Sequence, residues 1–257
     1  MSKALTRFFA LTFALSWSGW ILAVFSDTLR PFAMIAGTFG PAAAALILLR
    51  RRQIARRALI ARLFDWRLSA VTYAYALGLP VFGIVCALIA ARLVTGSGAV
   101  LPAQMPVYVP FLVFAYVLFL SVLGEELGWR GYALPDLLGR HGPVAASLIL
   151  GTVWAIWHAP LFFMPGGFHA GIPPLLFFIQ VVASSMIYTH LHILAAGSLV
   201  PAHLFHTVFN TAVGIFPILP AARGGDATAL WIAVAFLTAV AVVIARGLAR
   251  MPKLKGP

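Results

Sequence analysis

Charged side chains are scarce in this sequence. Only 9% of its 257 residues are charged while 62% are hydrophobic, and the mean hydropathy is +1.00. Soluble domains usually carry about 25% charged residues, so the composition excludes an ordinary soluble fold. The only cysteine, Cys86, excludes an intrachain disulfide and a cysteine-built metal cage. Because no polar linker, repeat or low-complexity tract interrupts the chain, we expect one integral-membrane domain over residues 1–257.

Acidic residues are the scarcest charges, with 6 Asp and Glu against 18 Lys and Arg and a net charge of +12. Such a balance indicates nucleic-acid binding when the basic residues form a face of a soluble domain. Here they occur in short runs between apolar segments. We therefore interpret them as membrane-topology signals and expect lipids, not nucleic acid, as partners.

Long apolar stretches, in contrast, are abundant. A helix needs roughly 20 apolar residues to cross a hydrocarbon core of about 30 Å. The sequence predicts an all-α polytopic membrane protein with about eight transmembrane helices and an active site inside the helix bundle. The N-terminal stretch resembles a signal peptide, but it is long and no small-x-small cleavage site follows, so we expect a retained first span. The predicted spans are 8–25, 32–49, 71–93, 109–127, 143–163, 172–190, 197–217 and 229–247.

The basic residues support an even number of spans. With eight spans, 15 of the 18 Lys and Arg residues fall on the side that holds both termini, and Arg130 is counted among them. Arg30, Arg92 and Arg223 fall on the opposite side. Since Lys and Arg in short loops gather in the cytoplasm, we predict a multi-pass protein of a bacterial inner membrane with both termini cytoplasmic.

Seven of these arginines lie between positions 50 and 67, interleaved with large apolar residues. One interpretation is an amphipathic helix on the anionic inner leaflet. The other is a solvated basic loop that only fixes the topology. The pattern is too short to separate the two.

Two adjacent glutamates, Glu125 and Glu126, end the apolar run 109–123, and Arg130 follows four residues after the second. Ionisable groups at membrane depth are expensive unless they are paired or line a wet cavity, so they usually mark functional sites. Residues four apart share a helix face, which predicts a Glu126–Arg130 pair. Glu125 is turned about 100° away and can face a different cavity. The alternative is one ion cluster of all three residues that caps the helix end.

Two later spans carry further polar pairs at helical spacing. Trp154 and His158 are four apart, with Pro160 breaking the helix just beyond, and we expect Trp154 to serve packing more than chemistry. His206 and Asn210 are also four apart, and both can donate hydrogen bonds to developing negative charge.

The remaining histidines carry weaker signals. We expect His203 to lie near the membrane surface and to bond a backbone carbonyl. We expect surface positions for the other four, and the His-Glu-x-x-His zinc signature is absent. These four are His141, His169, His190 and His192.

In order and spacing, these three motifs resemble those of the CPBP family. That family comprises the type II CAAX prenyl proteases and their bacterial relatives linked to bacteriocin processing and self-immunity, also called the ABI family. The resemblance covers about 121–214 in motif terms, and a family core of about 109–218. One departure is Trp154, where phenylalanine is common.

The resemblance implies an intramembrane endopeptidase that acts on membrane-associated or prenylated substrates. Glu125 is then the general base for a water that His158 holds, and His206 and Asn210 stabilise the oxyanion. Glu126, Arg130 and Trp154 then have supporting roles.

The resemblance leaves the metal requirement open. The family is commonly labelled metalloprotease, and Glu125, His158 and His206 could supply three ligands to Zn²⁺. A metal-free water activated by Glu125 and His158 uses the same residues. Two other functions stay open: a proton-coupled transporter, and a non-catalytic immunity or scaffold protein of the same family.

Overall fold

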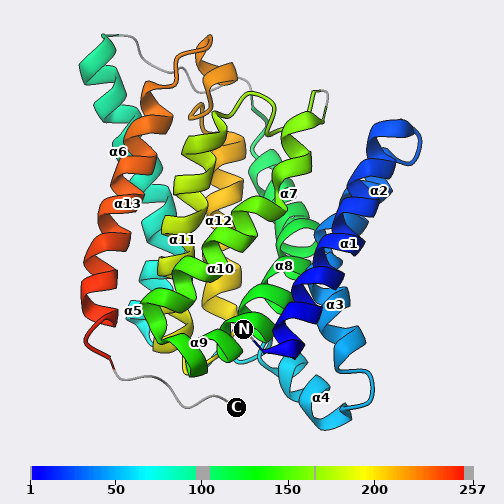
Figure 1. Ribbon diagram of the computed structural model, residues 1–257. Coiled ribbons are helices and arrows are strands. Elements are labelled where there is room, and N and C mark those ends of the chain that lie inside the picture. The colour runs from blue at the N-terminus through cyan, green and yellow to red at the C-terminus, as the bar shows by residue number, and fades with distance from the viewer. Residues whose placement is uncertain (1, 97–104, 165, 252–257) are drawn as a thin grey trace.

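The computed structural model describes residues 2–96, 105–164 and 166–251, and every regular element within them is helical (Figure 1). The helices are α1 (Lys3–Phe25), α2 (Arg30–Thr38), α3 (Gly40–Leu48), α4 (Gln53–Ala61), α5 (Ala70–Tyr73), η1 (Ala74–Gly78), α6 (Leu79–Thr95), α7 (Val109–Tyr116), η2 (Val117–Val122), α8 (Leu123–Gly128), η3 (Trp129–Ala133), α9 (Leu134–His141), α10 (Pro143–Trp157), η4 (Ala159–Phe163), α11 (Pro174–Leu194), α12 (Val200–Ile215), η5 (Pro220–Arg223) and α13 (Thr228–Leu248).

The number of spans agrees with the sequence prediction. Within the described ranges, seven helical segments are long and apolar enough to cross a membrane. The bent pair of α2 and α3 supplies an eighth if it is one span. The predicted all-α polytopic fold is therefore confirmed.

The predicted second span, 32–49, is wrong in one respect, because it is not a single helix. The axes of α2 and α3 differ by 50°. Pro41 lies in the first turn of α3, where it has no N–H to continue the preceding helix and its ring crowds the turn before it. The chain therefore bends between Thr38 and Gly40.

The predicted fourth span, 109–127, is longer in the structure and runs from Val109 to His141. The short helix α8 with both glutamates lies between two π-helical segments, η2 and η3. Such wide turns inside helices occur frequently at functional sites. They change which way the following residues face, so simple α-helical spacing does not predict the orientation of this segment.

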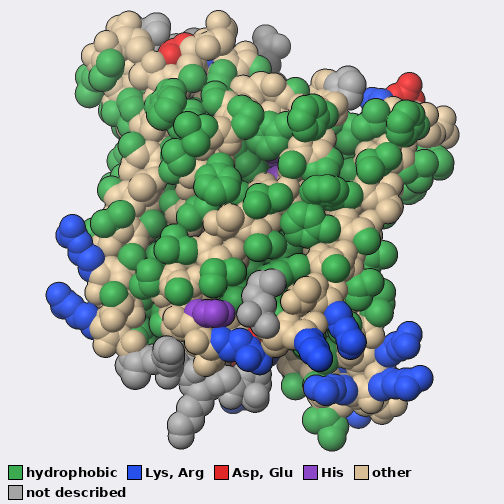
Figure 2. Space-filling view, viewed as in Figure 1, with side chains coloured by type: hydrophobic (Ala, Val, Ile, Leu, Met, Phe, Trp, Pro, Cys, Tyr) green, Lys and Arg blue, Asp and Glu red, His purple; other side chains and the backbone are tan. Residues whose placement is uncertain are grey.

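Basic side chains gather at one end of the bundle, which we call the basic end (Figure 2). The arginine-rich segment 50–67 contains the helix α4, which favours the amphipathic-helix interpretation. Leu59 is buried on its inner side, whereas Ile54 is 87% exposed. Arg130, counted as a loop charge from the sequence, lies inside the bundle at 0% exposure. Lys253 and Lys255 lie outside the described residues.

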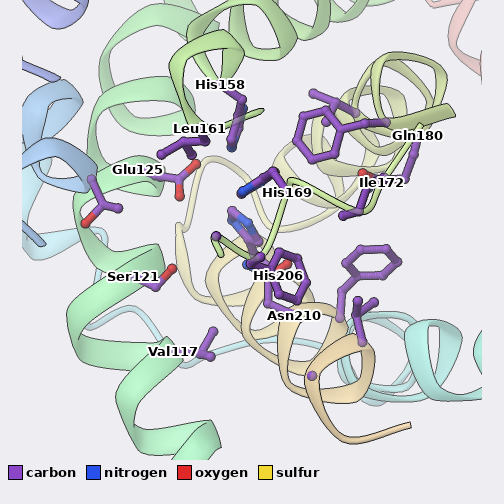
Figure 3. A pocket seen from close by; sticks show the side chains of 18 of the residues that line it. Val117, Ser121, Glu125, His158, Leu161, His169, Ile172, Gln180, His206 and Asn210 are labelled. Atoms are coloured by element: carbon purple, nitrogen blue, oxygen red, sulfur yellow. The ribbon is translucent and has the colours of Figure 1, made fainter. Parts of the chain in front are cut away.

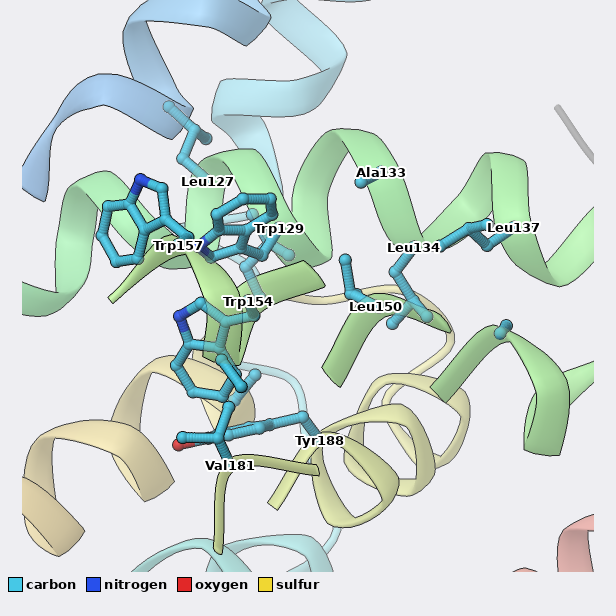
Figure 4. Packing of buried hydrophobic residues seen from close by; sticks show 14 of the residues in the cluster. Leu127, Trp129, Ala133, Leu134, Leu137, Leu150, Trp154, Trp157, Val181 and Tyr188 are labelled. Atoms are coloured by element: carbon cyan, nitrogen blue, oxygen red, sulfur yellow. The ribbon is translucent and has the colours of Figure 1, made fainter. Parts of the chain in front are cut away.

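Buried tryptophans from three helices pack together in the hydrophobic core, and Figure 4 shows two of them, Trp129 and Trp157. The ring of Trp157 lies 4.6 Å from that of Trp20 and 5.6 Å from that of Trp129, centroid to centroid. All three side chains are fully buried. Aromatic pairs of this kind add about 0.5–1.5 kcal/mol each beyond the burial of their area. This packing joins α1, η3 and the end of α10 directly beside Arg130 and His158, which follow Trp129 and Trp157 in the sequence.

Candidate functional site

Two glycines bring the glutamate helix against the bent second span. A Cβ atom on Gly124 would lie 2.7 Å from the Cα atom of Phe39, and one on Gly128 would lie 2.4 Å from the Cβ atom of Pro41. Only glycine permits this approach of backbones, as at other small-xxx-small helix contacts in membranes. The contact turns Glu125 and Glu126 away from α3 and into the bundle.

Glu126 is the centre of a buried ion cluster. Its Oε1 atom accepts hydrogen bonds from Nη1 of Arg130 at 2.9 Å and from Nδ1 of His206 at 2.8 Å. The side chains of Glu126 and Arg130 are 0% exposed. The predicted Glu126–Arg130 pair is thus confirmed. The bond from His206 to Glu126 was not predicted from the sequence.

Aromatic rings cover Arg130 and His206, the two groups that donate hydrogen bonds to Glu126. The guanidinium carbon of Arg130 lies 4.1 Å from the ring centroid of Trp154 and 4.0 Å from that of Tyr188. Cations within about 6 Å of a ring centroid are attracted by its electrons. The rings of Trp154 and Tyr188 also contact the imidazole of His206. Tyr188 was not found from the sequence, because a tyrosine in an apolar helix has no distinguishing pattern.

Glu125 has a different environment from its neighbour. It is 4% exposed, and its Oε2 atom accepts a hydrogen bond of 2.8 Å from Nε1 of Trp154. Trp154 therefore does more than pack, which the sequence analysis did not anticipate. One indole holds Glu125 through its N–H group and covers Arg130 with its ring, so the two halves of the site are joined by one side chain.

His158 lies just where α10 ends. Its Nδ1 atom is 2.8 Å from the backbone oxygen of Trp154. A carbonyl oxygen only accepts hydrogen bonds, so Nδ1 carries the proton and donates it. In the neutral ring, Nε2 is then left as an acceptor. The break in the helix is the predicted one, since the 3₁₀ turn η4 with Pro160 follows directly.

A hydrogen bond at Nδ1 also orients His206. Its Nδ1–H donates to the Glu126 carboxylate, which leaves Nε2 as the atom that faces other groups. Asn210 follows one turn later on α12 and lines the same cavity as His206. The two side chains thus share a helix face, as their spacing predicted.

Glu125, His158, His206 and Asn210 line a single cavity of about 390 Å³ (Figure 3). They come from α8, the end of α10, and α12, which are separated in sequence by about 30 to 50 residues each. The rest of the wall is mainly apolar and aromatic, with a few polar groups such as Ser121 and Gln180. A mostly apolar pocket with a few convergent polar groups is the usual form of a ligand site.

His169 also lines this cavity, although it was predicted to be a surface residue. Its ring lies 5.7 Å from that of His158 and 5.1 Å from that of Phe177. Burial lowers the pKa of His169 to about 4, so the ring is neutral near pH 7. The sequence offered no signal for it, because the connection between η4 and α11 folds back over His158.

The other histidines gave mixed outcomes. His203 bonds a backbone oxygen, that of Leu118, at 3.0 Å as expected, and His141 is exposed as expected. His190 is half-buried with its ring 6.2 Å from that of Tyr75. The surface position predicted for His192 is wrong: α11 continues past it to Leu194, and the side chain is buried.

The geometry also bears on the zinc prediction. Among the described residues, no group of three or more His, Cys, Asp or Glu side chains is arranged to hold a metal ion. Glu125, His158 and His206 line one cavity, and their hydrogen bonds use Oε2 of Glu125 and Nδ1 of each histidine. A zinc requirement stays a prediction.

Two comparisons with known proteins match the part of the chain that contains these residues. The type II CAAX prenyl endopeptidase Rce1-like family matches residues 107–212. A protein of Methanococcus maripaludis described as CAAX prenyl protease 2 is 29% identical over 140 residues. That alignment covers 52% of this chain and 50% of the relative, so the chain spans about half the length of the relative it matches.

The matched segment holds the three motifs in their order, and the fold gathers their residues around one cavity. Both matches support the resemblance to the CPBP family that the three motifs indicate.

Proposed function

We propose that the chain is an intramembrane endopeptidase that hydrolyses a peptide bond of a membrane-associated substrate. The observation that carries the proposal is the convergence of Glu125, His158, His206 and Asn210 on one cavity. The family and the name of the relative support the same class of reaction. Hydrolysis needs a base near a water and donors near the new oxyanion, and these four side chains are suited to both tasks.

The first step is the activation of water by Glu125. The carboxylate takes one proton as the water oxygen attacks the carbonyl carbon of the substrate. Nε2 of neutral His158 accepts the second hydrogen of that water as a hydrogen bond, because Nδ1–H is already directed at the oxygen of Trp154. The indole N–H of Trp154 donates a hydrogen bond to Glu125 and so holds the base in place. A positioned general base typically contributes a factor of about 10² to 10⁴ in rate.

The second task is stabilisation of the tetrahedral oxyanion by His206 and Asn210. Nδ1–H of His206 is directed at Glu126, so Nε2 can donate to an oxyanion only if the ring carries both protons. The Glu126 carboxylate holds the ring in place, because it accepts hydrogen bonds from both His206 and Arg130. The amide N–H of Asn210 supplies the second donor. A single donor of this kind is typically worth roughly 3 to 4 kcal/mol.

Collapse of the intermediate completes the reaction. The carbon–nitrogen bond breaks, the proton held by Glu125 passes to the leaving amine, and the former water oxygen remains in the new carboxyl group. Glu125 returns to its ionised state, so no other reactant is consumed.

The substrate we propose is a lipidated or prenylated membrane peptide. The cavity wall supports an apolar substrate, since it includes Phe168, Phe177 and Phe209. The name of the relative supports a prenylated one. A substrate panel separates these possibilities from an unlipidated membrane peptide.

The test is cleavage of fluorogenic peptides by the purified chain in detergent and in nanodiscs. The panel contains matched prenylated, acylated and unlipidated sequences. We expect turnover by the native chain and its loss in the Glu125→Ala, His158→Ala and His206→Ala variants. His141→Ala, which changes an exposed histidine away from the cavity, is the matched control and should retain turnover.

Near-native turnover of the Glu125→Ala variant would contradict the proposal. Cleavage of no peptide, combined with proton uptake that depends on Glu125, would favour a transporter instead. A chelator arm addresses zinc: turnover that a chelator removes and Zn²⁺ restores supports a metal requirement, and unchanged turnover supports a metal-free water.

A further inference from the structure

The side chain of Tyr188 on α11 lies among the polar groups of the cavity wall. Its ring centroid is 4.0 Å from the guanidinium carbon of Arg130 and 5.6 Å from the ring centroid of His206. Figure 4 shows it beside Trp154, whose ring centroid is 5.7 Å away. Tyr188 lines the same cavity as Glu125. It therefore belongs to the group of side chains around which the proposed hydrolysis takes place.

The hydroxyl of Tyr188 has no hydrogen-bond partner among the described residues. A buried tyrosine hydroxyl normally has one, and this side chain is only 1% exposed. The hydroxyl is also absent from the fully enclosed polar atoms that lack a partner, so the little surface it exposes faces the cavity. It can therefore donate a hydrogen bond to a molecule that occupies the cavity.

The position of this hydroxyl is fixed by the packing of its ring. The ring centroids of Phe205 and Trp154 lie 5.2 Å and 5.7 Å from that of Tyr188. Electrostatic interactions link the hydroxyl to Glu126, Arg130 and Glu125, which places it near the proposed base. A donor that is already in position costs no reorganisation when negative charge develops beside it.

The proposed oxyanion site lacks a second neutral donor without this hydroxyl. Nδ1–H of His206 is directed at Glu126, so Nε2 of the neutral ring is an acceptor and cannot donate. The amide of Asn210 then acts alone. A tyrosine hydroxyl donates a hydrogen bond without any change in its protonation, and tyrosine is among the side chains that stabilise oxyanions.

We propose that the Tyr188 hydroxyl is a catalytic hydrogen-bond donor to the oxyanion of the tetrahedral intermediate. This inference rests on the proposed peptidase function and adds a residue to its site. The hydrogen bond forms as the substrate carbonyl oxygen gains charge, and the hydroxyl keeps its proton throughout. Tyr188 and Asn210 thus supply two neutral donors from the neighbouring helices α11 and α12.

The first test is the Tyr188→Phe variant, which removes the hydroxyl and keeps the ring over Arg130. We expect kcat to fall roughly 100- to 1,000-fold, as for the loss of other oxyanion donors. KM should stay unchanged, because the bond is made only in the transition state. The midpoint of unfolding should also match that of the native chain. Both are measured with one reporter peptide in detergent.

Two further variants separate the hydroxyl from the ring. Tyr116→Phe is the matched control, because Tyr116 lines the same cavity but is 52% exposed on α7, and it should keep the native kcat. Tyr188→Leu removes the ring as well and should lower both kcat and the midpoint of unfolding. Native kcat in Tyr188→Phe together with an inactive Tyr188→Leu would assign the ring alone and overturn the proposal.

A second measurement uses inhibitors of the reporter peptide. A phosphinic analogue carries an anionic oxygen on a tetrahedral phosphorus, and a reduced-amide analogue has no oxygen at that position. Transition-state analogues respond to groups that act in the transition state. We expect Tyr188→Phe to weaken binding of the phosphinic peptide roughly 100-fold or more and to leave the reduced amide unchanged. Equal effects on both inhibitors would overturn the proposal.

The native chain separates a failure of this inference from a failure of the proposed function. If the native chain cleaves the reporter and Tyr188→Phe cleaves it at the same rate, the role of Tyr188 is wrong and the peptidase function stands. If the native chain cleaves no peptide of the panel, both are wrong.

Discussion

Two ion pairs ten residues apart have the same spacing and different surroundings. Glu126 and Arg130 are four residues apart with atoms 2.9 Å from each other, and Asp136 and Arg140 are four apart at 3.0 Å. The first pair is 0% exposed on both sides. In the second pair the arginine side chain is 50% exposed and the aspartate 29%. Sequence spacing thus predicts the contact, but burial decides its energetic role.

The difference follows from solvation. An exposed pair contributes about 0–1 kcal/mol, because water and salt screen it and holding two long side chains costs entropy. A buried pair gains little over an apolar replacement of both partners, yet loss of one partner leaves an uncompensated buried charge. The buried pair therefore constrains the site strongly, whereas the exposed pair contributes little to the fold.

The largest effect is expected from Arg130→Met. The variant removes the main partner of Glu126 and the cation between Trp154 and Tyr188. We expect a loss of roughly 3–5 kcal/mol in the free energy of unfolding, measured by denaturant titration in detergent. In the double variant with Glu126→Gln the loss should be smaller than in Arg130→Met alone. Equal losses in the two would mean that the buried charge of Glu126 is not the cause.

An intermediate effect is expected from Arg62→Gln. Nε of this arginine donates to the oxygen of Gly197 at 2.5 Å and Nη1 donates to that of Gly131 at 3.0 Å. These carbonyls belong to the turn before α12 and to the segment that holds Arg130. Burial lowers the pKa of the Arg62 guanidinium, which nevertheless stays charged at neutral pH.

Hydrogen bonds from a charged donor contribute about 1.5–3 kcal/mol each. If the Gln amide keeps one of the two bonds, Arg62→Gln should lower the free energy of unfolding by about 2 kcal/mol. Arg57→Gln, an exposed arginine on the same basic segment, is the matched control and should be close to neutral. If both substitutions have the same effect in denaturant titration, Arg62 has no special place in the coupling of α4 to the site.

The smallest effect is expected from Arg140→Ala. Only the exposed pair with Asp136 is lost, and Asp136 keeps its hydrogen bond from the hydroxyl of Ser2 at 3.1 Å. The free energy of unfolding should fall by less than about 1 kcal/mol. The difference from the native chain should shrink further at high salt, since salt screens exposed pairs. A loss as large as that of Arg130→Met would remove the distinction between the two pairs.

The sequence predicted the pairs and the spans well, because both follow from spacing and composition. The Glu126–Arg130 contact and the shared face of His206 and Asn210 needed only helical periodicity. The 33-residue helical run around α8 and its two π-helical segments was not predicted, since spacing alone does not locate wide turns.

Contacts between distant segments were also beyond the sequence. Tyr188, His169 and the bond from Trp154 to Glu125 depend on how α8, α10 and α11 meet in three dimensions. The hydrogen bond from Nδ1 of His206 to Glu126 was not predicted either, because it depends on how α8 and α12 meet. A sequence without an alignment gives no information on such pairings.

The central claim is that Glu125 is the general base and that Glu126 balances the buried positive charge. Comparing substitutions of the two glutamates tests this claim most directly. The measurement is the turnover number of Glu125→Gln and Glu126→Gln on one reporter peptide, with the midpoint of unfolding of each variant. We predict that Glu125→Gln unfolds like the native chain but loses roughly 100- to 10,000-fold in turnover. Native-like turnover in Glu125→Gln would contradict the account, whatever Glu126→Gln does.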